Sequence, residues 1–176
     1  MIARLLVCAL LIGLAGVASA QNQPAQTQQK PAAQQLTPEQ RAAIQKRNQE
    51  LVSYANQILK MIDNGQSAQV WDDMSEVGKK VVTRSAFEKK ISTERSTLGT
   101  AKSRRIVGLY GNQSDGQHDL PAGMYFNVRY LTQFSGSQAP KIELVSFHQD
   151  SDRKLRLSGY AVTDVPQKAA QSAPKK

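Results

Sequence analysis

Apolar residues recur every three or four positions in the first part of the chain, as they do along the buried face of an α-helix. The segment Thr37-Pro38-Glu39-Gln40 matches a helix start, because Thr37 can cap, proline suits the first helical position and Gln40 can complete a capping box. Asn64-Gly65 predicts the end of this helix. Its apolar stripe consists of Leu51, Tyr54, Ala55, Ile58, Leu59 and Ile62.

Two further helical segments are expected before the pattern changes. Residues 66–80 predict a short helix that ends near Gly78. A third helix is expected to begin at Thr83 or Ser85 and to end at Gly99, since glycine readily takes the left-handed conformation at a helix end. The sequence therefore predicts three helices in this part of the chain.

After Gly99 the apolar period changes to two, which is typical of β-strands. Strands are expected at residues 105–110, 124–134, 142–149 and 155–162. They are joined by loops rich in Gly, Asp and Ser, so an antiparallel meander is favoured. The fold class is accordingly α+β, with three N-terminal helices packed on an antiparallel sheet of about four strands.

The N-terminus has the pattern of an export signal. Arg4 precedes an apolar run from Leu5 to Val17, and Ala18-Ser19-Ala20 supplies the small residues of a cleavage site. The run is shorter than the ~20 residues that span a bilayer. We therefore expect cleavage after Ala20, a periplasmic location and no transmembrane anchor in the mature chain.

The segments that flank the expected domain have low complexity. Residues 21–36 are rich in Gln, Ala and Pro, and residues 165–176 are small, polar and basic, so both are expected to be disordered. These limits leave one α+β domain at residues 37–164.

Composition narrows the classes of partner. The formal net charge of the 176-residue chain is +9, which favours an anionic partner or simply keeps the protein in solution. Phe87 is the only aromatic residue in the basic stretch between Val77 and Val107, so nucleic-acid binding through base stacking is not indicated. Cys8, the only cysteine, lies in the expected signal. The mature chain is therefore expected to contain neither a disulfide nor a thiolate metal site.

No residue pattern marks a catalytic centre. His118 has acidic neighbours on one loop but nothing that completes a metal shell, and His148 has the context of an edge or core histidine. No serine has the context of a nucleophile, and no cofactor is expected. A carboxylate base would have to be Asp63, Asp72, Asp73 or Glu143, and the sequence favours none of them.

Several short motifs together resemble an uncharacterised family of mostly exported bacterial proteins, catalogued as domain of unknown function 4019. In order, they are Trp71, Phe87, Arg95-x-x-Leu98-Gly99, Arg104-Arg105, Leu120-Pro121-x-Gly123-x-Tyr125, Ile142-Glu143-Leu144-Val145 and Gly159-Tyr160. The tryptophan that family members usually carry before the last strand is absent here, where Leu155 follows Lys154. The resemblance implies the cone-like fold of nuclear transport factor 2, in which a curved sheet wraps helices around a pocket and often mediates homodimers. It implies no activity.

Six residues are candidates for a pocket or a structural cluster: Trp71, Arg95, Arg105, Tyr125, Glu143 and Tyr160. Trp71 is interpreted as a packing anchor, whereas either tyrosine can line a cavity or pack against the sheet. A buried Glu143 needs a cationic partner. Strand alternation places Arg105 on the face of Val107 and Leu109, so we expect an Arg95–Glu143–Arg105 cluster with surplus positive charge.

Two functions remain open from the sequence. The first is an exported accessory or interaction module whose partner the sequence leaves open, with an envelope protein as one candidate. The alternative is a protein that binds a small molecule or an envelope anion in a pocket between the helices and the sheet.

Overall fold

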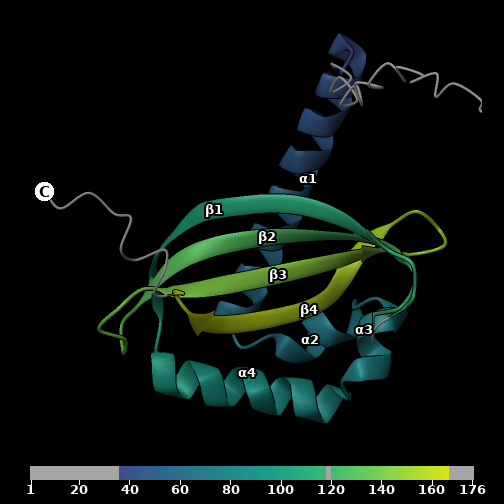
Figure 1. Cartoon of the computed structure of the whole chain (residues 1–176). Helices are drawn as coiled ribbons and strands as arrows, with labels where there is room; N and C mark the ends of the chain where they lie inside the picture. The colour runs from purple at the N-terminus through teal and green to yellow at the C-terminus, as the bar shows by residue number, and fades with distance from the viewer. Residues whose placement is uncertain (1–35, 118–119, 167–176) are drawn as a thin grey trace, which may run out of the picture. The chain divides into compact units, whose positions relative to one another are not determined.

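The computed structural model describes residues 36–117 and 120–166. The expected signal, nearly all of the expected leader and the last ten residues of the expected tail lie outside these ranges. The described chain has an α+β fold with one antiparallel sheet of four strands in the order β1-β2-β3-β4 (Figure 1). The predicted fold class and strand number are therefore confirmed. In the described ranges no helix combines the length and apolar character needed to cross a membrane.

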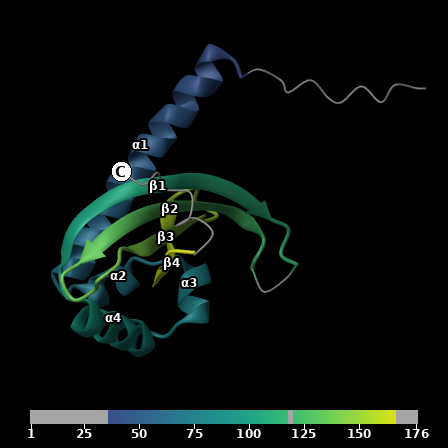
Figure 2. The same cartoon turned by 60° about the vertical axis from the view of Figure 1, so that its left-hand side comes forward.

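The first helix, α1 (Pro38–Asp63), begins as predicted. The backbone N–H of Gln40 donates to Oγ1 of Thr37 across 3.2 Å, and the N–H of Thr37 donates to Oε1 of Gln40 across 2.8 Å. All five buried residues of the helix lie between Leu51 and Ile62. The half before Leu51 has none, and it projects past the edge of the sheet at β1 (Figures 1 and 2).

The second predicted helix is two helices, α2 (Ser67–Asp72) and α3 (Glu76–Val81), so the expected count of three was wrong. Ser75 separates them because its extended backbone and its side chain, which accepts from the N–H of Val77, start a new helix. Gly78 lies inside α3 and does not end it.

Close packing explains why residue 78 is glycine. A Cβ atom there would lie 2.9 Å from the carbonyl oxygen of Ser158 on the last strand. The next helix, α4 (Arg84–Leu98), is capped by Thr83 and ends at Gly99 with φ of 73°, as predicted.

The sheet contains β1 (Ala101–Ser114), β2 (Gly123–Phe134), β3 (Lys141–Gln149) and β4 (Leu155–Asp164). β1 is much longer than the predicted 105–110, because its polar ends pair with β2 through backbone groups whatever their side chains are. Two β1 residues, Lys102 and Val107, have no partner on β2 and form bulges.

The helices lie on one face of the curved sheet (Figure 2). Alternate residues of β2 point to this face, and the core also contains Val145, Phe147 and Leu157 from the other strands. Glu143 is fully buried in the same layer, which places a carboxylate inside a mostly apolar packing.

Candidate functional site

Glu143 on β3 is the centre of a buried polar cluster. Its side chain is 0% exposed, and both of its carboxylate oxygens accept hydrogen bonds. Oε2 accepts from Nε of Arg104 across 2.6 Å and from Oγ1 of Thr132 across 2.6 Å. Oε1 accepts from Nη2 of Arg95 across 3.0 Å and from the hydroxyl of Tyr160 across 2.7 Å. Four donors on four elements therefore hold one buried carboxylate.

Asp63 at the end of α1 completes the Glu143 cluster. Nη2 of Arg104 lies 2.8 Å from Oδ1 of Asp63, and Nη2 of Arg95 lies 3.2 Å from the same oxygen. Two guanidinium groups thus face two carboxylates, and the formal charges cancel. The expected surplus of positive charge is absent from this cluster, which consists of Asp63, Arg95, Arg104, Thr132, Glu143 and Tyr160.

Arg104 takes the place that we expected for Arg105. Strict alternation counted back from Leu109 and Val107 selects Arg105, but Val107 is a bulge residue and shifts the alternation by one position. Arg104 pairs with Thr132 on the helix-facing side of the sheet, whereas Arg105 is exposed. The expected pairing of Arg95 with Glu143 is present.

The electrostatics of Glu143 favour the ionised carboxylate. Burial alone would raise its pKa, but the hydrogen bonds and charge of Arg104, with the hydroxyls of Thr132 and Tyr160, outweigh burial and lower the pKa. Burial and the neighbouring Glu143 carboxylate raise the pKa of Tyr160. An ionised carboxylate whose oxygens are all engaged is poorly suited to accept a proton from a substrate.

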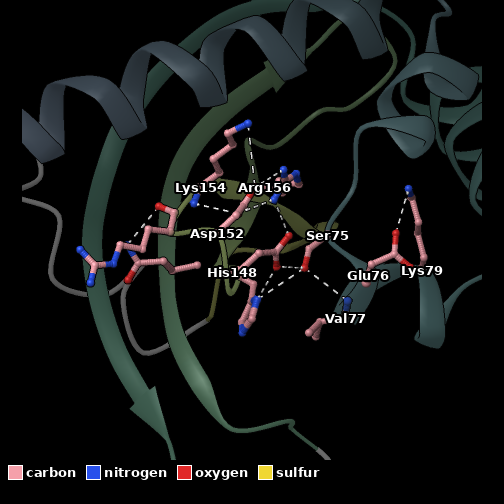
Figure 3. A network of polar contacts seen from close by, with 11 residues as sticks. Ser75, Glu76, Val77, Lys79, His148, Asp152, Lys154 and Arg156 are labelled. Carbon is pink, nitrogen blue, oxygen red and sulfur yellow. Dashed lines mark hydrogen bonds and ion pairs between the residues drawn. The ribbon is translucent and has the colours of Figure 1, made fainter.

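A second polar network joins the start of α3 to the turn between β3 and β4 (Figure 3). Nδ1 of His148 lies 2.7 Å from Oδ1 of Asp150, and Oγ of Ser75 donates to the same oxygen across 2.5 Å. Nη1 of Arg156 donates to Oδ2 of Asp150 across 2.8 Å, and Nη2 lies 2.7 Å from Oδ2 of Asp152. We call these five residues the Ser75 network.

The Ser75 network contains the residue types of a hydrolase triad in the wrong arrangement. A triad needs the serine on one imidazole nitrogen and the aspartate on the other. Here Ser75, at 3.4 Å, and Asp150 both face Nδ1 of His148, and Ser75 is 0% exposed. Hydrogen bonds from Ser75, His148 and Arg156 outweigh burial and lower the pKa of Asp150. The arrangement is that of a helix cap tied to a turn.

Two open clefts lie beside these networks. One of about 710 Å³ borders the Ser75 network and is lined by residues such as Tyr54, Asp73 and Arg156. The other, of about 440 Å³, lies beside the Glu143 cluster and is lined by Asp63 and Arg95, among others. Both volumes are in the range of small-ligand sites. Among the described residues no group of three His, Cys, Asp or Glu side chains is placed to hold a metal ion.

Trp71 and Tyr125, the two candidate residues not yet placed, lie outside the Glu143 cluster. Trp71 is half-buried against the core, and its Nε1 donates to the carbonyl of Val82 across 3.0 Å. The hydroxyl of Tyr125 donates to the carbonyl of Pro121 across 2.9 Å, and its ring centroid lies 4.8 Å from that of His148. Trp71 and Tyr125 therefore make local packing contacts at different places.

Sequence reasoning missed Asp63 as a partner of the arginines, and it missed Thr132. Asp63 carried a usable signal, because it follows Leu59 by four residues and so continues the apolar stripe of α1. A carboxylate at that position is placed beside the core, where it needs a cation.

The fold and the two networks define a small α+β domain whose buried ionisable groups pair with one another. The family model for the protein of unknown function DUF4019 matches residues 54–160, and the chain belongs to this family. The matched stretch includes every residue of the Glu143 cluster and of the Ser75 network. No curated protein and no solved structure matches the chain.

Proposed function

We propose that this protein is an exported interaction module that works in the periplasm without a catalytic centre of its own. The observation that supports this function is the engagement of its buried carboxylate and its buried serine. Glu143, whose pKa is lowered by its partners, is held by four donors, and Ser75 is buried with its hydroxyl on Asp150. A side chain locked in this way stabilises a fold, whereas an active site keeps a group free for its substrate.

Export is part of the same proposal. The apolar run and small residues of the first twenty positions support a cleaved signal, so the mature chain would begin at Gln21. Intact-mass measurement of the protein recovered from the periplasm tests this directly. A mass that includes Met1 to Ala20 would overturn it.

The cone-like fold of nuclear transport factor 2 is the finer fold assignment that we propose. It is supported by the order of the elements, with the described helices preceding a meander of four strands. The bulges at Lys102 and Val107 also support it, because bulges bend a strand and allow a sheet to curve around helices.

Small-molecule binding is a second candidate function, and one observation favours it. Nη1 of Arg95 is buried without a hydrogen-bond acceptor, and Arg95 lines the cleft of about 440 Å³. A buried guanidinium donor without an acceptor is costly, so a ligand that carries a carbonyl or carboxylate oxygen would be stabilised there.

Native mass spectrometry of protein purified from its own host separates the two functions. For an interaction module we expect the polypeptide mass or its multiples, with no retained small molecule. A discrete additional mass that is lost in Arg95→Met but kept in Arg105→Met would instead establish the cleft as a ligand site. Arg105 is the matched control because it is an exposed arginine next to the cluster.

A further inference from the structure

The two edges of the sheet differ in how they are covered. At the β4 edge, the N–H of Ser75 donates to the carbonyl of Leu157 across 2.8 Å, and Gly78 of α3 packs against Ser158. At the β1 edge, no backbone group outside β2 pairs with residues 101–114 within the described parts of the chain. One edge is thus protected by a helix and the other is open.

The open edge lacks the charges that normally protect such a strand. Its basic residues lie at one end, between Lys102 and Arg105, while the nine residues from Ile106 to Ser114 include no charged side chain. Ile106 and Val107 are each 42% exposed, and Tyr110 is 45% exposed. A long edge strand with exposed apolar side chains and no charge is a template for strand pairing.

The projecting half of α1 lies beside this edge and is also uncovered. Residues 38–50 form about half of α1, and none of them is buried. Isolated helices shorter than ~12–15 residues are marginal in water, so this half needs a packing partner or is only weakly stable. Figures 1 and 2 show it extending past β1, in the direction in which a paired strand would be added.

We propose that two copies of this chain pair through their β1 edges, antiparallel, over the uncharged residues 106–114, in which the bulge at Val107 leaves residues 108–112 as the regular part of the ladder. The proposal rests on the proposed function as an interaction module and names its first partner, a second copy. Full overlap of the uncharged stretch places Tyr110 opposite Tyr110 of the second copy. Aromatic pairs across antiparallel strands are favourable.

Charge favours this orientation over a parallel one. Antiparallel pairing moves the basic residues Lys102 and Arg105 of the two copies to opposite ends of the interface, whereas parallel pairing in register would place like charges side by side. Stable interfaces bury about 800 Å² per partner, which is more than one strand edge offers. The joined sheet keeps both α1 helices on the same face, where each projecting half reaches under the other copy and adds contact area.

The oligomeric state tests the proposal. Light scattering and sedimentation of the purified protein over a wide concentration range should give twice the monomer mass at high concentration. Tyr110→Lys places two like charges at the centre of the interface and should raise the dimer dissociation constant at least about 10-fold. Val81→Lys is the matched control, because Val81 is 78% exposed on α3, away from this edge, and should leave dimerisation unchanged.

Cysteine cross-linking tests the register in a Cys8→Ser background, which has no other thiol. Directly opposed residues on antiparallel strands have Cα atoms about 4.5–5.5 Å apart, which a disulfide can bridge. Tyr110→Cys should therefore form a covalent dimer on mild oxidation. Gln113→Cys should not, because six residue steps separate the two copies of that position, about 20 Å.

Three results would overturn the proposal. They are a monomer at all concentrations, a dimer that Tyr110→Lys does not weaken, and equal cross-linking at both cysteines. A retained small molecule in native mass spectrometry would instead overturn the interaction function, so the two failures can be told apart. The β1 pairing and the interaction function are both supported if the chain is dimeric, if Tyr110→Lys weakens the dimer and if only position 110 cross-links.

Discussion

Arg104 donates from Nε to Oε2 of Glu143 across 2.6 Å, although the two residues lie on strands that are not neighbours. The guanidinium reaches across β2, past Thr132, and also binds Asp63 at the end of α1. One side chain thus connects an edge strand, an inner strand and a helix. Because Glu143 is 0% exposed, removing one of its two cationic partners leaves a buried charge that is only partly compensated.

Arg104→Met should therefore destabilise the protein, by about 2–4 kcal/mol, because it leaves Glu143 with an incomplete set of donors. Arg105→Met, the same change one residue later, should stay within about 0.5 kcal/mol, since Arg105 is exposed. Urea unfolding of both variants measures the difference. Equal losses at the two positions would contradict the assignment of Arg104 to the cluster.

The structure places Arg104, and not the predicted Arg105, beside Glu143. This difference shows what the sequence could and could not predict. The capping box at Thr37, the helix end at Gly99 and the four antiparallel strands follow from local patterns and were confirmed. Arg95 and Glu143 were also paired correctly, because each borders an apolar stripe. The bulge at Val107 has no local signal, and one unpaired residue reverses which side chain faces the helices.

The split of the second helix has a different cause. Its apolar residues continue through Ser75 without a break in composition, and Ser75 becomes a cap only because its N–H and hydroxyl meet Leu157 and Asp150 from distant elements. Asp63 was noted as a possible base and not as an ion-pair partner, since its partners are 32 and 41 residues away. Tertiary contacts of this kind are not visible in a local pattern.

The stability of the Glu143 cluster should depend on pH. The pKa of Glu143 is lowered below its ordinary value of 4.5, so the unfolded chain takes up the proton at a higher pH than the folded one. The stabilisation is fully present above about 4.5 and is lost as the pH falls through the lower, folded pKa. Asp150, whose pKa is also lowered, contributes in the same direction.

We therefore expect the melting temperature to fall as the pH drops below about 4.5. Glu143→Gln should cost about 3–5 kcal/mol at neutral pH, because it leaves the arginines in excess over Asp63. Its melting temperature should then fall less steeply in acid than that of the wild type. Circular-dichroism melts across the acidic range measure both slopes, and parallel curves would show that Glu143 does not contribute.

Gly78→Ala sets helix propensity against packing. Alanine inside a helix is favoured over glycine by roughly 0.5–1 kcal/mol. The added Cβ would lie 2.7 Å from Cε of Met74, which can move, and 2.9 Å from the carbonyl oxygen of Ser158, which belongs to β4. Overpacking of this kind costs typically ~1–3 kcal/mol, so we expect a net loss of stability.

Gly108→Ala is the control for that change. A Cβ at position 108 meets its nearest atoms at 3.8 Å, an ordinary contact, so this variant should be as stable as the wild type or slightly more stable. Thermal melts of the two variants decide between the effects. A Gly78→Ala protein that melts above the wild type would mean that α3 moves freely away from β4.

Trp71 tests the distinction between a packing residue and a ligand-binding ring. Its indole donates to the carbonyl of Val82 and packs against the core while Nζ of Lys79 lies 5.3 Å from the ring centroid. Trp71→Phe keeps an aromatic ring and removes the hydrogen bond, so it should cost about 1 kcal/mol. Trp71→Ala removes the packing as well and should cost about 2–4 kcal/mol, near the lower end because the ring is half-buried.

Circular dichroism is the suitable probe, since Trp71 is the only tryptophan and both variants lose its fluorescence. An alanine variant as stable as the wild type would show that the ring does not support the fold and would favour a role in binding.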